Sequence, residues 1–137
     1  MRTADRTLSG RLLTALKDLR YGGLLRGNLP SKFSHLGAFY TANTPYHILP
    51  TLFAGLVNND DVLVEVGCGK GRVINWWLSK YPRNRVYGIE LDPDAATKAA
   101  IRLRRYPNVK IISGDACRLL PADGTIFFPL IHLMKTS

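Results

Sequence analysis

The chain has few cysteines, few acidic residues and no long hydrophobic run. Among 137 residues only Cys68 and Cys117 are cysteines, which is too few for a disulfide framework or a recognisable zinc site and is typical of a reducing compartment. A membrane span needs about 18 consecutive apolar residues, but the longest candidate, 125–134, contains Pro129 and His132. The N-terminal residues also lack the apolar core of a secretory signal. The sequence therefore predicts a cytoplasmic protein with no metal site and no membrane span.

The composition is that of a globular protein with a surplus of positive charge. Hydrophobic residues make up 46% of the chain, and 19 Lys and Arg against 10 Asp and Glu give a formal net charge of +9. The surplus is spread along the chain rather than gathered in one tail. Such a surplus favours phosphate-bearing partners, so a nucleic-acid-binding protein is one hypothesis for the function. The charge indicates nothing about the fold.

The first 39 residues are predicted to form a basic helix and a connector. Four leucines stand at helical spacing and are followed by residues that end helices, three glycines and a proline. These are Leu8, Leu12, Leu16 and Leu19, then Gly22, Gly23, Gly27 and Pro30. Residues 40–137 are predicted to form a second unit.

That second unit opens with a helix signal. Thr44 is a good N-cap, and Pro45 suits the first helical position. The apolar residues that follow recur at the spacing of one buried helix face: Ile48, Leu49, Leu52, Phe53 and Leu56.

Strands and helices alternate from residue 62 onward. Strands are predicted at 62–66, 85–91, 109–112 and 125–128. Between the first two strands, a helix with Ile74, Trp77 and Leu78 on one face ends before Tyr81 and Pro82. Between the second and third, Asp92 caps a helix whose buried stripe is Ala96, Ala99, Ala100 and Leu103. This order predicts an α/β fold, a Rossmann-like parallel sheet with helices on both faces.

A glycine-rich turn, Gly67-Cys68-Gly69-Lys70-Gly71, follows the first strand. In an open parallel sheet this position lies at the carboxyl edge, where ligands bind. The dinucleotide fingerprint requires a glycine where this chain has Arg72, which counts against NAD. The Walker pattern is also absent, because no Gly-Lys-Ser/Thr follows the turn.

Acidic residues stand at the ends of the next two strands. Glu90 lies nineteen residues beyond Gly71, where a carboxylate accepts hydrogen bonds from the two hydroxyls of a ribose. Asp115 follows Gly114 at the end of the third strand, where its carboxylate suits an adenine amino group beside the Ala116 N–H. The pattern predicts a nucleoside ligand.

The segments 65–71, 88–92 and 114–116 together resemble the first three motifs of class I S-adenosylmethionine-dependent methyltransferases. The resemblance covers about residues 40–128. It implies S-adenosylmethionine as the cofactor, methyl transfer by in-line displacement at the sulfonium, and an acceptor that stays unknown: nucleic acid, protein or lipid. It also implies a set of cofactor-binding residues: Glu65, Gly67, Cys68, Gly69, Gly71, Glu90, Leu91, Asp115 and Ala116.

A weaker similarity involves the segment 40–46, Tyr-Thr-Ala-Asn-Thr-Pro-Tyr. It is similar to a loop of the non-SET histone-lysine methyltransferases that folds over the cofactor. This similarity implies that Tyr40 and Thr44 contact the methionine end of the cofactor.

Several of these residues also have purely structural interpretations. The glycine run also fits a plain tight turn, Glu90 a solvated strand end, and Asp115 the cap of a helix near 117–120. Cys68 is interpreted as a small turn residue rather than a nucleophile. Lys98, Arg102 and Arg105 repeat at i, i+4 and i+7 and predict a solvated basic face.

The resemblance fails after the fourth strand. In the family this strand ends in an acceptor-site motif, but here Phe128 is followed by 129–137, which carries no such motif. The sequence therefore predicts a partial, truncated methyltransferase domain over 40–137 in which the C-terminal strands are missing, so that no catalytic residue is assigned. The alternatives are a non-catalytic cofactor-binding or interaction module and a basic nucleic-acid-binding protein.

Overall fold

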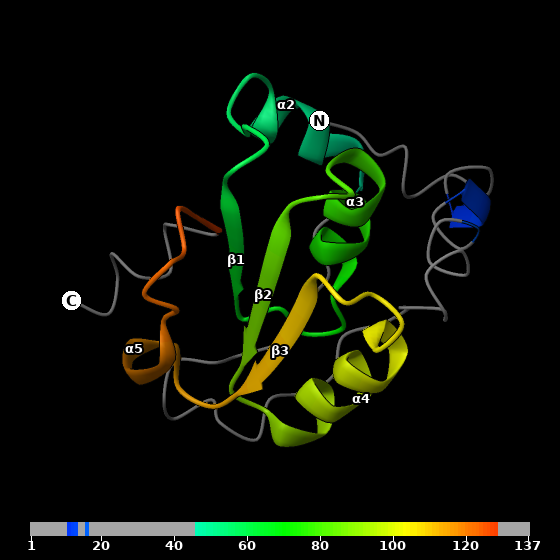
Figure 1. The fold of residues 1–137 in the computed structure, drawn as a ribbon. Coiled ribbons are helices and arrows are strands. Elements are labelled where there is room, and N and C mark those ends of the chain that lie inside the picture. The colour runs from blue at the N-terminus through cyan, green and yellow to red at the C-terminus, as the bar shows by residue number, and fades with distance from the viewer. Residues whose placement is uncertain (1–10, 14–15, 17–45, 129–137) are drawn as a thin grey trace.

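The computed structural model describes residues 11–13, 16 and 46–128 (Figure 1). The elements follow in the order η2 (Tyr46–Ile48), α2 (Leu49–Phe53), β1 (Val62–Val66), α3 (Arg72–Lys80), β2 (Arg85–Glu90), α4 (Pro93–Leu103), β3 (Val109–Ser113), α5 (Ala116–Leu119) and β4 (Ile126–Phe128). Most of the predicted N-terminal helix and connector lies outside the described residues. Residues 11–13 and 16 are helical, and Leu12 and Leu16 are exposed. No helix among the described residues is long and apolar enough to cross a membrane.

The four strands form one parallel sheet in the order β3-β2-β1-β4. The strand order reverses at β1, so the chain moves outward through β2 and β3 and then returns to the other side of β1. In the view of Figure 1, α3 and α4 lie to the right of the sheet and α5 to its left. The predicted Rossmann-like α/β fold is confirmed.

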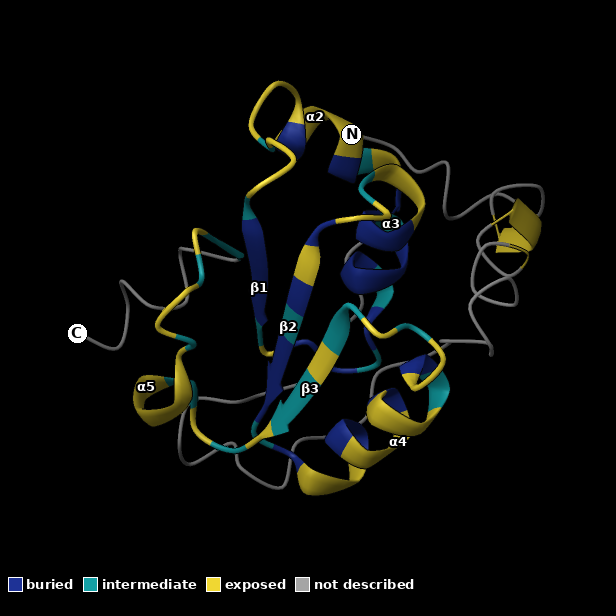
Figure 2. Cartoon of the chain, in the orientation of Figure 1, coloured by how far each residue is buried: buried dark blue, intermediate teal, exposed yellow. Residues whose placement is uncertain are grey.

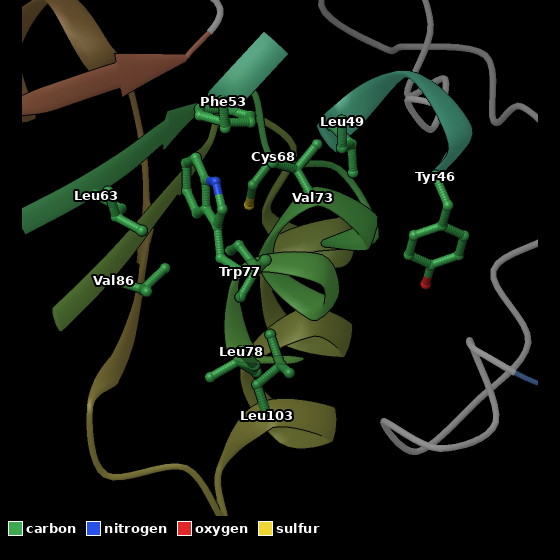
Figure 3. Close-up of a cluster of buried hydrophobic side chains, with 11 residues drawn as sticks. Tyr46, Leu49, Phe53, Leu63, Cys68, Val73, Trp77, Leu78, Val86 and Leu103 are labelled. Carbon is green, nitrogen blue, oxygen red and sulfur yellow. The ribbon is translucent and has the colours of Figure 1, made fainter. Parts of the chain in front are cut away.

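Hydrophobic side chains of α3 pack against the sheet and hold this architecture together. Trp77 and Ile74 are fully buried in one cluster with Leu63 of β1 and Val86 of β2. The Trp77 ring meets Phe53 of α2 edge-on, with ring centroids 5.5 Å apart. Figure 3 shows Trp77 pointing from α3 toward Phe53 and the strands. Burying one large aromatic side chain removes about 150–250 Å² from water, so this cluster anchors α2 and α3 to the sheet.

Burial is greatest along β1, at the carboxyl end of β2 and in part of the glycine turn, where Cys68, Gly69 and Gly71 are buried and Gly67 is exposed. Figure 2 shows β1 buried along nearly its whole length and β2 alternating toward full burial at its carboxyl end. The N-terminal edge of the sheet is tied together by Thr125, whose Oγ1 accepts a hydrogen bond from the Val62 N–H at 2.8 Å and donates one to Asp61 Oδ1 at 2.8 Å. These contacts fix β4 beside β1.

Two helix predictions need correction. The predicted helix from Thr44 is shorter than expected: Thr44 and Pro45 lie outside the described residues, α2 ends at Phe53, and Leu52 and Leu56 are exposed at 49% and 51%. The turn at Gly55, with φ +67°, breaks the periodicity that the leucines suggested. In α4, Ala95 is buried instead of Ala100, so the buried stripe lies slightly further round the helix.

Candidate cofactor site

The site lies at the carboxyl edge of the sheet, where the glycine turn leaves β1. Gly67, Gly69 and Gly71 all have positive φ, at +71°, +52° and +85°. Residues other than glycine rarely adopt this backbone conformation, which explains why three glycines occur within five residues. The entropic cost of three glycines indicates that the turn needs this particular backbone path rather than any tight turn.

The first half of the turn is hydrogen-bonded to β2. The Gly67 and Cys68 N–H groups both donate to the Ile89 carbonyl, at 2.8 and 3.0 Å. The Gly69 N–H donates to Glu90 Oε1 at 2.9 Å. The turn therefore packs against the end of β2, the strand that carries Glu90, which is predicted to bind the ribose.

Glu90 is buried, and each of its two carboxylate oxygens accepts a hydrogen bond from a backbone N–H. Its Oε2 accepts a hydrogen bond from the Asp92 N–H at 2.9 Å, while Oε1 holds Gly69. Asp92 in turn caps α4 through a hydrogen bond from the Asp94 N–H at 2.9 Å, as the sequence predicted. A carboxylate offers about four acceptor positions, so two bonds to backbone N–H groups leave capacity for hydroxyl donors.

Glu65 is the second buried carboxyl at this edge. Burial raises the pKa of Glu65 well above its ordinary value of 4.5, and the nearby Glu90 raises it further, while the Ile74 N–H and Arg102 oppose the shift. Its Oε2 is buried and has no hydrogen-bond partner among the described residues. An unsatisfied buried polar atom costs free energy, so this oxygen is a candidate ligand-binding atom.

Asp115 lies where β3 runs into α5. Its Oδ1 accepts a hydrogen bond from the Cys117 N–H at 2.9 Å, so the capping interpretation holds. The preceding residue, Gly114, has φ +146° and donates its N–H to the Glu90 carbonyl at 2.9 Å. The ends of β2 and β3 are therefore tied together beside Leu91 and Ala116, both partly buried.

Cys68 is a structural residue of the turn. It is 4% exposed, and burial raises the pKa of its thiol, with the charges of Glu65 and Glu90 adding to the effect. Its sulfur lies against Gly88 of β2, where an added Cβ would approach it to 3.0 Å. A buried thiol that resists ionisation is a poor nucleophile.

The fold thus brings together Glu65, Gly67, Gly69, Gly71, Glu90 and the start of α5 at one edge of the sheet. Tyr40 and Thr44 lie outside the described residues.

The predicted solvated basic face on α4 needs correction. Lys98 and Arg105 are exposed, but Arg102 is half-buried and donates to the Lys70 carbonyl at 2.6 Å. Sequence spacing did not reveal this contact, because the partners lie 32 residues apart.

Comparison with known proteins agrees with this geometry. A family model described as "Methyltransferase domain" matches residues 63–135, more than half of the chain. The chain belongs to this methyltransferase family. The resemblance to class I S-adenosylmethionine-dependent methyltransferases is therefore confirmed at the level of the family, while the similarity to the histone-lysine type stays a prediction.

Curated relatives match less than half of this chain. A tRNA (guanine-N(7)-)-methyltransferase of Brevibacillus brevis is 34% identical over 64 residues, 45% of this chain and 30% of that protein. A protein of the same name from Oenococcus oeni is 39% identical over 62 residues, 42% of this chain and 28% of that protein. The chain thus spans under a third of the length of either relative.

A solved structure shares the fold of the domain. The RNA methyltransferase of Salinibacter ruber, in complex with S-adenosyl-L-homocysteine, superposes with a TM-score of 0.55 and 26% identity. The match covers 63% of this chain and 58% of that one. The predicted family cofactor, S-adenosylmethionine, is consistent with this neighbour.

Proposed function

We propose that the carboxyl edge of this sheet binds S-adenosylmethionine and that the protein is a methyltransferase acting on RNA. The observation that carries the proposal is the position of Glu90, whose buried carboxylate accepts hydrogen bonds from the Gly69 N–H of the glycine turn and from the Asp92 N–H. Glu90, the acid predicted to bind the ribose, is thereby held at a fixed distance from the glycine turn.

The residues at the edge fit the cofactor. At Gly67, an added Cβ meets nothing within 4 Å, so the backbone there is open to close approach by a ligand. Glu90 would accept from the ribose hydroxyls, and Asp115 and Ala116 would lie at the adenine. The unsatisfied Glu65 Oε2 would lie toward the methionine end, where a cationic group satisfies a buried carboxyl oxygen.

When bound, the cofactor supplies a sulfonium methyl group that an acceptor displaces in line. The protein's task is to hold donor and acceptor in register and to exclude water, which together can contribute about 7–11 kcal/mol of barrier lowering. Glu90 and the glycine turn perform the donor half of that task. No residue of the described part of the chain is assigned as a base for the acceptor.

RNA is the acceptor class that the observations favour. The net charge of +9 suits a phosphate backbone, and two relatives that match part of this chain are named as tRNA methyltransferases. Each of these relatives matches less than half of this chain, so they support the methyltransferase family more directly than the acceptor.

The proposal is tested by incubating the purified chain with labelled S-adenosylmethionine and separate samples of unmodified tRNA, ribosomal RNA, duplex DNA, core histones and lipid. We expect label in RNA, and much less label when Glu90→Ala replaces the parent. Label in protein, DNA or lipid instead of RNA would contradict the acceptor class. Cofactor binding with no transfer to any acceptor would favour the alternative, a non-catalytic cofactor-binding module.

A further inference from the structure

An arginine of α4 contacts the second half of the glycine turn. Arg102 Nη2 donates to the Lys70 carbonyl at 2.6 Å and lies 3.4 Å from the Gly71 carbonyl. Its Nη1 donates to Asn75 Oδ1 at 2.6 Å. The planar guanidinium offers donors in a fixed arrangement, so it joins the end of the turn to α3 in one geometry.

The partner on α3 is itself held in place. Asn75 is fully buried, its Nδ2 donates to the Tyr46 hydroxyl at 3.1 Å, and its N–H donates to the Gly71 carbonyl at 3.0 Å. A buried amide with both ends hydrogen-bonded is rigid, since any rotation leaves a polar group unsatisfied. Arg102 therefore docks on a fixed acceptor.

Gly71 provides the space for the guanidinium. An added Cβ at Gly71 would lie 2.7 Å from Arg102 Nη2 and 3.6 Å from Leu103 Cδ1. The φ of +85° already disfavours other residues at this position, and a side chain there would also have to displace the hydrogen-bonded guanidinium.

The turn is consequently held from two sides. β2 holds its first three residues through the Ile89 carbonyl and the Glu90 carboxylate, and α4 holds its last two through Arg102. The first hold involves the acid assigned to the ribose. The second comes from Arg102, which is not among the residues assigned to the cofactor.

We propose that Arg102 is a positioning residue for the cofactor, which sets the path of the glycine turn by binding its carbonyl oxygens. The inference rests on the proposed function of the same site. Loss of the guanidinium releases the Lys70 carbonyl and leaves the Gly71 carbonyl with only the Asn75 N–H, so that the turn samples paths in which its backbone no longer matches the ligand.

The test measures the affinity for S-adenosylhomocysteine by calorimetry for the parent, Arg102→Ala, Arg102→Lys and the control Arg104→Ala. Arg104 is an exposed residue of equal charge next to the same helix end. All titrations are run at a temperature where circular dichroism shows every variant folded. If Arg102→Ala does not fold, Arg102→Lys is judged by the same criteria, because a lysine keeps the charge but not the two-pronged geometry.

We expect Arg102→Ala to bind about tenfold or more weakly, as for loss of a charged hydrogen bond, and Arg104→Ala to bind as the parent does. Free guanidinium, at concentrations far below those that unfold the chain, is expected to restore part of the affinity of Arg102→Ala and to leave Arg104→Ala unchanged. A purely structural role would lower the melting temperature without this rescue of affinity.

Three results would overturn the inference: unchanged affinity in folded Arg102→Ala, equal weakening in Arg104→Ala, or an affinity loss that guanidinium does not restore. Failure of the parent chain to bind S-adenosylhomocysteine contradicts the proposed function itself. That outcome is seen before any variant is compared, so the two failures are distinguishable.

Discussion

The Glu90 carboxylate and the Gly69 N–H are joined by a buried hydrogen bond of 2.9 Å between the end of β2 and the middle of the glycine turn. This bond couples the two parts of the site that a nucleoside cofactor would touch. A substitution at Glu90 therefore changes both the ligand contact and the turn.

Replacing Glu90 by alanine is expected to weaken the binding of S-adenosylhomocysteine by about 1.5–3 kcal/mol, the range for hydrogen bonds to a charged group. Calorimetric titration measures the loss. Asp60→Asn is the control, because Asp60 is an exposed acid in the turn before β1. Parent-like affinity in Glu90→Ala, with unchanged circular dichroism, would show that Glu90 does not hold the ribose.

The sequence predicted the parts of the fold that depend on local pattern. The strands, the boundaries of α3 and the Asp92 cap all follow from periodicity, glycine and capping residues within one or two turns. The Arg102 contact could not be predicted in this way. It depends on the crossover that brings α4 beside the glycine turn, and the basic spacing of α4 alone favours a solvated face.

Asn75 shows the same limit from the other side. The sequence places it among apolar residues of α3, and nothing local reveals that its amide is fully buried between Tyr46 and Arg102. For Asp115, by contrast, the sequence allowed both a cap and an adenine ligand. The structure establishes the cap, and the adenine role stays a prediction.

Replacing Asp115 by serine separates its two roles. A serine hydroxyl still accepts from the Cys117 N–H as an N-cap, but it is too short to reach a base. We expect the affinity for S-adenosylhomocysteine to fall by about 0.5–1.5 kcal/mol, with stability changed by only a few tenths of a kcal/mol. An affinity equal to that of the parent would leave Asp115 as a cap alone.

Glu65 is expected to give the chain a pH-dependent stability. Its pKa is raised in the folded state, so its contribution to stability is full below about pH 4.5 and is lost as the pH rises through the raised value. Glu65→Gln cannot ionise and should lose less stability than the parent between about pH 5 and pH 8. Urea unfolding of both proteins at the two pH values measures the difference. Identical pH dependence in parent and variant would mean that the carboxyl is ionised in the folded chain.

Gly88 of β2 is expected to tolerate no side chain without cost. An added Cβ would lie 2.8 Å from Ile111 Cδ1, 2.8 Å from Ile74 Cδ1 and 3.0 Å from the Cys68 sulfur. Gly88→Ala should reduce the free energy of unfolding by about 1–3 kcal/mol, the usual cost of overpacking a core. Chemical denaturation measures it, with Gly55→Asn as a comparison at a position of open space and positive φ. Unchanged stability in Gly88→Ala would show that the two isoleucines repack freely.

The most direct measurement of the central claim is a paired calorimetric titration of the parent chain with S-adenosylhomocysteine and with NAD. Arg72 begins α3 where a dinucleotide fold requires glycine, and it stacks over the Tyr46 ring at 5.3 Å. We predict that S-adenosylhomocysteine binds and that NAD does not. Tighter binding of NAD, or no binding of S-adenosylhomocysteine, would contradict the assignment of this sheet edge as a methyl-donor site.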